Sequence, residues 1–193
     1  AESGNTADMA RLVFQNFGPP YVIKPPAEGT SYGIRIADTI IELPDTIADV
    51  IDLFGAALVE EFVIGEEATV GILEDFRNEE LYAFPPAHVQ MPDTMRYLHR
   101  SAVSDGHVRY NVPSNFSHAE KAAIADLARA AHKTLGLSHY SNADIIMSRR
   151  GPVLLEVNTS PGLHQHAPFP HMLESVGSSI REFAEHSIWL ARR

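Results

Sequence analysis

Two strand-forming segments joined by a three-residue turn limit the possible folds more strongly than any other feature of the sequence. Asn142–Ser148 and Pro152–Val157 are rich in Ile, Val and Leu, and Arg149-Arg150-Gly151 lies between them. A turn this short joins antiparallel neighbours, and Gly151 supplies the left-handed backbone position that such turns use. We therefore expect a β-hairpin here, so at least part of the chain forms an antiparallel sheet.

The register of this hairpin brings two carboxylates together. If Ser148 lies opposite Pro152, then Asp144 lies opposite Glu156, and opposed side chains share one face about 4.5–5.5 Å apart. Asn158, two residues later, points to the same side. Two like charges this close are unfavourable unless a cation lies between them, and oxygen ligands without sulfur favour Mg²⁺ or Mn²⁺. We therefore interpret Asp144, Glu156 and Asn158 as metal ligands; the alternative is an ordinary exposed hairpin face.

The remaining pattern predicts an α+β fold. Helical spacing and caps indicate helices at residues 6–17, from Asp45 or Thr46 to Phe54, from Ser117 to Leu135, and from Ser179 onward. Further strands are expected at residues 21–24, 34–36, 58–63, 68–73 and 81–84. Residues 85–113 predict a long loop with short strands, and residues 158–170 a second loop. Short connections between adjacent strands favour mostly antiparallel sheets with helices packed on them.

Composition narrows the classes of function. The chain has 193 residues, enough for one large domain or two small lobes. Its 15 Lys and Arg against 25 Asp and Glu give a net charge of −10, which disfavours binding to nucleic acid or an anionic membrane through bulk charge. The absence of cysteine excludes disulfides, thiolate metal sites and cysteine nucleophiles. No apolar run approaches the roughly 20 residues that cross a bilayer.

Two segments near the start of the chain carry groups suited to a nucleotide. Lys24 ends a strand and precedes the Gly-rich run Glu28–Gly33, whose backbone N–H groups and hydroxyls can surround phosphates; a plain hairpin turn is the alternative. Glu60–Val63 and Glu67 place acids on an apolar strand. Such a strand can hold an adenine edge and ribose hydroxyls, although a half-solvated edge strand is the better explanation when this segment is taken alone.

A third segment follows the predicted metal ligands. Thr159–Gly162 would direct backbone N–H groups toward the same site. His164, His166 and His171 come next and raise the question of zinc. A closed zinc site needs a fourth ligand and a clearer spacing, so we interpret these side chains as loop or pocket histidines.

In this order the segments resemble the ATP-grasp superfamily, most closely the D-alanine–D-alanine ligase family. The resemblance spans about residues 7–190 and is most specific at Glu156–Gly162. It implies an ATP-grasp fold, two α+β lobes with mostly antiparallel sheets that hold ATP between them. Residues 1–60 would form the smaller lobe with its phosphate-covering loop, and residues 61–193 the larger lobe with the metal site. The family's N-terminal substrate domain would then precede this chain.

The resemblance also implies a role for individual residues. It assigns the nucleotide to Lys24, Glu28, Thr30, Ser31, Glu60, Glu61, Phe62, Val63, Glu67 and Leu155. Within that set Lys24 and the loop meet the phosphates, Glu60–Val63 the adenine and Glu67 the ribose. It assigns two Mg²⁺ ions to Asp144, Glu156 and Asn158, and catalysis to Lys24, Ser31 and Gly162, the last through a backbone group that stabilises a tetrahedral oxyanion.

The implied chemistry joins a carboxylate to an amine. The carboxylate attacks the γ-phosphate of ATP to give an acyl phosphate, and the amine then displaces phosphate to form an amide. The resemblance therefore implies amino acids or peptides as substrates and a cytoplasmic ligase of cell-wall peptidoglycan synthesis, and it allows a homodimer. Neither nucleic acid nor membrane is expected as a partner.

Three departures concern the substrate half of that family's site. Asn142 stands where the family has an arginine, Ala167 where it has a serine, and His99–Ala102 lacks the family's Lys-Tyr pair. Arg96, Arg100 or Arg109 are the candidates for a replacement cation. Two alternatives to a D-alanine–D-alanine ligase follow: an ATP-grasp ligase for another amino acid or peptide pair, and a nucleotide-binding module without catalysis.

Overall fold

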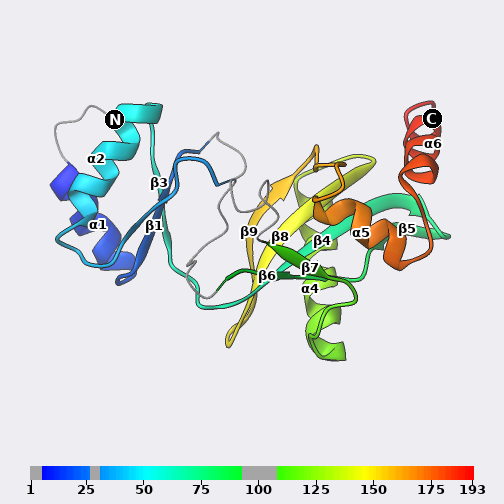
Figure 1. Cartoon of the computed structure of the whole chain (residues 1–193). Coiled ribbons are helices and arrows are strands. Elements are labelled where there is room, and N and C mark those ends of the chain that lie inside the picture. Colours follow the sequence, from blue (N-terminus) through cyan, green and yellow to red (C-terminus); the bar gives the residue numbers. More distant parts are fainter. Residues whose placement is uncertain (1–5, 27–30, 93–107) are drawn as a thin grey trace. The chain divides into compact units, whose positions relative to one another are not determined.

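The computed structural model describes residues 6–26, 31–92 and 108–193, which form two compact units (Figure 1). The small unit consists of residues 6–26 and 31–63, and the large unit of residues 64–92 and 108–193. The division falls between Val63 and Ile64, close to the boundary after residue 60 that the sequence suggests. Each unit has its own core and is described by itself.

The small unit packs two helices on a three-stranded antiparallel sheet. The helices are α1 (Thr6–Asn16) and α2 (Leu43–Phe54), and the strands are ordered β2 (Arg35–Ala37), β1 (Tyr21–Lys24) and β3 (Leu58–Glu61). Helix α2 begins before the predicted Asp45, because Pro44 needs no N–H partner in a first helical turn. It ends as predicted at Gly55, whose φ of 81° is left-handed.

The large unit is built on a six-stranded antiparallel sheet. Its strands are ordered β7 (Arg109–Asn111), β6 (Ala87–Gln90), β4 (Gly65–Phe76), β8 (Tyr140–Ser148) and β9 (Gly151–Asn158), and β5 (Glu79–Ala83) also pairs with β4. Neighbouring pairs are antiparallel throughout. The predicted α+β class with antiparallel sheets is confirmed.

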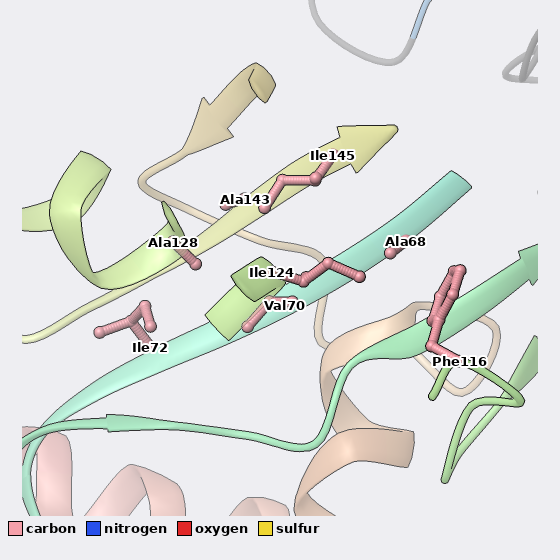
Figure 2. Packing of buried hydrophobic residues seen from close by; sticks show 8 residues of the cluster. All are labelled: Ala68, Val70, Ile72, Phe116, Ile124, Ala128, Ala143 and Ile145. Carbon is pink, nitrogen blue, oxygen red and sulfur yellow. The ribbon is translucent and has the colours of Figure 1, made fainter. Parts of the chain in front are cut away.

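Helix α4 (His118–Thr134) covers one face of this sheet (Figure 1). It begins at the predicted capping box, in which Ser117 and Glu120 each bond the other's backbone N–H. Figure 2 shows its side chains Ile124 and Ala128 packed against alternate residues of two strands. Those strand residues are Ala68, Val70 and Ile72 of β4 and Ala143 and Ile145 of β8. Because strand side chains alternate, the intervening residues of both strands lie on the opposite face.

Helix α5 (Pro168–Ser175) packs on part of that opposite face, and α6 (Ile180–Leu190) follows it. Phe169 and Met172 of α5 are fully buried against Leu73 of β4 and its neighbours. The expected loop at residues 158–170 is therefore wrong from Pro168 onward. Prolines at positions 168 and 170 hide the helix in the sequence, although a first helical turn tolerates them because its N–H groups lack helical partners.

Asp144 pairs with Glu156 in the β8–β9 hairpin as predicted, but the length of the turn and the register next to it differ from the prediction. Ser148 lies opposite Gly151, not Pro152, so only Arg149 and Arg150 form the turn. A shift of register between Ile145 and Asp144 then leaves Leu155 as an extra residue on β9. The predicted three-residue turn was wrong, and a β-bulge, which the sequence pattern does not reveal, restores the pairing.

Candidate functional site

Acidic side chains from three adjacent strands lie on the face of the large sheet opposite α4. We use the name acidic cluster for Glu67 of β4, Asp144 of β8 and Glu156 of β9. Asp144 pairs with Glu156 on one side and with Thr69 on the other, and Glu67 lies two residues before Thr69. Alternation along the strands therefore places all three carboxylates on one face.

Asn158 lies between two of these carboxylates. Its Nδ2 donates to Asp144 Oδ2 at 3.0 Å and to Glu156 Oε1 at 3.3 Å. The amide thus occupies the position between two anions that a cation would take. A half-turn of the amide would direct its oxygen there instead, completing a set of two carboxylates and one carbonyl-type oxygen. Such a set suits Mg²⁺, which binds to proteins through one or two carboxylates and keeps several waters.

The raised pKa values of two carboxyl groups show that the acidic cluster favours a bound positive charge. Burial raises the pKa of Asp144 to about 7; the charge of Glu156 adds to the rise, and hydrogen bonds from Thr69, Asn142 and Asn158 oppose it. Burial, followed by the charges of Asp144 and Glu156, raises the pKa of Glu67 to about 7. Both shifts mean that the ionised carboxylates lack a compensating cation.

The donor set consists of two carboxylates and an amide rather than a cluster of acids and imidazoles. Within the described ranges, no three His, Asp or Glu side chains are grouped closely enough to hold a metal ion. Nor does any described Lys, Arg or His pair with a member of the acidic cluster. The residues present therefore fit a hard cation that brings further ligands of its own, such as water or phosphate.

Asn142 holds Asp144 in place from the same strand. Its Nδ2 donates to Thr69 Oγ1 at 2.7 Å and to Asp144 Oδ1 at 3.1 Å, and the residue is only 3% exposed. Its amide therefore supports the acidic cluster. Ala167, which stands where the family resemblance places a serine, is buried at the N-cap of α5. Its side chain forms no capping hydrogen bond with that helix.

Tyr110 of β7 is a member of this face that the sequence analysis missed. Burial, together with the charges of Asp144 and Glu67, raises its pKa above the ordinary value, so its phenol lies near both carboxylates. Its ring stacks on that of His171, with centroids 6.5 Å apart. Tyr110 falls in the weakly patterned stretch at residues 85–113, and only the pairing of β7 with β6 reveals where it points.

The small unit carries the predicted phosphate and adenine residues. Lys24, at the end of β1, is ion-paired through Nζ with Glu60 Oε2 at 2.8 Å, and its side chain is 17% exposed. Glu61 ends β3, and the N–H of Phe62 donates to the carbonyl of Pro20. Ser31 has a φ of 57°, an uncommon value for a residue other than glycine.

The remaining predicted site residues lie in other parts of the chain. Leu155 is the extra residue at the β9 bulge, and Gly162 lies in the exposed loop before α5, beside His164 and Ala167. His164 and His166 are exposed, with ring centroids 6.4 Å apart. Glu28, Thr30, Arg96, Arg100 and the stretch His99–Ala102 lie outside the described residues. In the described part of the chain, no helix has the length and apolarity needed to span a bilayer.

Comparison with known proteins identifies the family. The family model described as "D-ala D-ala ligase C-terminus" matches residues 1–188. A D-alanine–D-alanine ligase of Desulforudis audaxviator is 31% identical over 99% of this chain and 61% of its own length. That of Maridesulfovibrio salexigens is 35% identical over 93% of this chain and 58% of its own length.

Solved structures agree with this assignment. The D-alanyl-alanine synthetase A of Vibrio cholerae matches 98% of this chain and 57% of its own chain, with a TM-score of 0.81 and 26% identity. A D-Ala:D-Ser ligase of Enterococcus faecalis shares the fold, with a TM-score of 0.79, 22% identity, and matches over 97% of this chain and 60% of its own. The chain thus spans about three fifths of the length of the relatives it matches. It belongs to the family described as the C-terminus of D-alanine–D-alanine ligases.

Proposed function

We propose that this chain is the nucleotide- and metal-binding region of an ATP-dependent ligase that joins a carboxylate to an amine through an acyl phosphate. One observation carries the proposal: Asp144, Glu156 and Asn158 converge on the face of the large sheet without a described cation. A polyphosphate with bound Mg²⁺ would bring that positive charge to them. Membership of the ligase family supports the same conclusion.

In this proposal Asp144, Glu156 and Asn158 hold Mg²⁺, with Asn158 turning its amide oxygen toward the ion. When bound, the metal would neutralise charge on the phosphates during transfer. Asn142 and Thr69 keep Asp144 in place through the hydrogen bonds described above. Because the donors around Asp144 are preorganised, the site needs little rearrangement when the cation arrives.

The nucleotide-binding residues in this proposal are those that the family resemblance assigns. Lys24 would meet its phosphates, Glu60–Val63 would hold the adenine and Glu67 the ribose. The 2.8 Å pair between Lys24 and Glu60 keeps the ammonium group oriented in the absence of a nucleotide. Ser31, at its left-handed position, and the neighbouring residues Glu28 and Thr30 would cover the phosphates, and Leu155 would pack against the base.

The chemistry requires a nucleophilic carboxylate and then an amine. The first attacks the terminal phosphorus of ATP, with ADP leaving, and forms an acyl phosphate. The amine then attacks the acyl carbon, and inorganic phosphate leaves. The backbone N–H groups around Gly162 would stabilise the negative charge on the tetrahedral oxygen, a role in which one preorganised donor contributes about 2.7–4 kcal/mol.

The substrate pair differs from D-alanine with D-alanine in this proposal. Asn142 is neutral and engaged with Asp144, so it cannot serve as the arginine that the family resemblance places there. Ala167 has no hydroxyl for the carboxylate of a second amino acid. We therefore expect the second substrate to be another amino acid, a peptide or a related amine.

The test is phosphate release from Mg-ATP in the presence of single amino acids and short peptides, with product analysis by mass spectrometry. The longest native form of the protein should be used. We expect release to rise with one substrate pair and the product to contain a new amide. Release that no acceptor stimulates would favour the nucleotide-binding module, and D-alanyl-D-alanine formed at ordinary enzymatic rates would overturn the proposed role of Asn142 and Ala167.

A further inference from the structure

Resting on the proposed function, we propose that Tyr110 is a phosphate-contacting residue whose hydroxyl donates a hydrogen bond to a nonbridging oxygen of the metal-bound nucleotide. The family comparison and the sequence pattern assign it no role. The argument rests on the strand register, the packing of the ring and the hydrogen bonds already formed around the acidic cluster.

The strand register sets the position of Tyr110. It pairs with Val89 on β6, and β6 pairs with β4 through Ala68–His88. Continuing that register by one residue places Val89 beside Glu67. Glu67, Val89 and Tyr110 therefore form one row across three strands, on the same face of the sheet. With strands about 4.8 Å apart, the Cα atoms of Tyr110 and Glu67 are separated by about two strand spacings, most of which a tyrosine side chain can span.

The packing of the ring determines its direction. Val89, in the same row, is only 5% exposed, and Tyr110 packs at the border of the core formed by α5. The ring of His171 stacks on Tyr110. An aromatic ring held by this packing has few alternative rotamers, and the charges of both Asp144 and Glu67 act on its phenol, so the hydroxyl lies on the side of the acidic cluster.

The other donors on this face are already engaged. The amides of Asn142 and Asn158 and the hydroxyl of Thr69 all bond to Asp144. No hydrogen bond from the Tyr110 hydroxyl to another described residue is present. A phenol is protonated at neutral pH, so Tyr110 offers a donor that is not yet used, next to a cluster of acceptors.

A phosphate oxygen is the acceptor that best fits this donor. A divalent cation at the acidic cluster leaves some oxygens of the polyphosphate without a metal contact, and these accept strong charge-assisted hydrogen bonds. The competing acceptor is the ribose that Glu67 would hold, and AMP separates the two, because it carries the ribose without the metal-bound phosphates. Tyr110 would therefore distinguish nucleotides that carry the metal-bound phosphates from AMP, which lacks them.

The experiment compares the wild type with Tyr110→Phe by isothermal titration calorimetry, using Mg-ATP and AMP. The variant keeps the ring that stacks on His171 and removes only the hydroxyl. Tyr82→Phe is the matched control, because Tyr82 packs at the border of the same core through Phe76 and Phe84. Melting temperatures of all three proteins should agree within a few degrees.

We expect Tyr110→Phe to raise the Kd for Mg-ATP about tenfold, as the loss of one hydrogen bond to a charged group predicts. The Kd for AMP should be unchanged, and Tyr82→Phe should resemble the wild type with both ligands. An unchanged Kd for Mg-ATP, or an equal loss of AMP affinity, would overturn the inference while leaving the proposed function intact. A wild type that binds no Mg-ATP would overturn both.

Discussion

Replacing Asp144 by asparagine should stabilise the metal-free protein while abolishing its metal site. Burial and Glu156 raise the pKa of this carboxyl from 3.8 to about 7 in the folded state. A raised carboxyl pKa means that the folded state binds the proton more tightly than the unfolded state. The stability of the wild type therefore falls as pH rises from about 4 through 7.

The magnitude follows from the size of the shift. About three pKa units correspond to about 4 kcal/mol at pH 8, where Asp144 is ionised in both the folded and the unfolded state. At pH 5 the folded state is protonated and the cost is less than half of that. Asparagine removes the charge, and Asn158 can turn its amide to give the new side chain an acceptor. Because some hydrogen bonds to the carboxylate are lost, we expect a net gain of about 1–4 kcal/mol at pH 8.

The assay is urea unfolding in EDTA, followed by the fluorescence of Trp189, the single tryptophan, which lies in α6 of the large unit. Asp144→Asn should unfold at higher urea than the wild type at pH 8, and the difference should shrink at pH 5. Thr46→Ser, in the small unit, is a control that should follow the wild type in this signal. A variant less stable than the wild type at pH 8 would refute the reasoning, because it would show that Asp144 is stabilised as an anion by its hydrogen bonds.

Three further predictions concern the same unit. Glu156→Gln should fold normally by circular dichroism and lose metal-dependent ATP turnover; unchanged turnover would exclude Glu156 as a ligand. Because Asp144 and Glu67 have pKa values of about 7, protons should compete with Mg²⁺, so its affinity measured by calorimetry should fall as pH drops from 8 to 6; a pH-independent affinity would contradict this. Gly71→Ala should cost about 1–3 kcal/mol in urea unfolding, because the new methyl group would lie 2.8 Å from the buried Phe169 ring; wild-type stability would show that the ring can move.

Sequence patterns that depend only on neighbouring residues predicted most of the helices and strands. The helix that begins at Ser117 was found because its capping box with Glu120 depends only on neighbouring residues. The end of α2 at Gly55 was found for the same reason, since a left-handed C-cap favours glycine. By contrast, α5 was missed because Pro168 and Pro170 disfavour a helix in most contexts, and only tertiary packing of Phe169 overrides them.

The pairing of Asp144 with Glu156 could be predicted from the sequence, but the placement of Glu67 and Tyr110 on the same face could not. Asp144 and Glu156 lie on two strands joined by one short turn, so recognising the β-hairpin was enough to pair them. The length of the turn and the bulge at Leu155 were not predicted. Glu67 and Tyr110 reach the same face through β4, β6 and β7, whose pairing is set by long-range packing. No local pattern places Tyr110 on the same face of the sheet as Asp144.

Binding of ATP with and without Mg²⁺ tests the central claim most directly. Calorimetry on the purified chain would measure the Kd of ATP in excess Mg²⁺ and again in EDTA. If Asp144, Glu156 and Asn158 bind the nucleotide through a cation, ATP should bind with a measurable Kd in Mg²⁺ and at least tenfold more weakly in EDTA, because the carboxylates of Asp144 and Glu156 then repel the phosphates. Equal binding in Mg²⁺ and in EDTA, or no binding in either, would contradict the account.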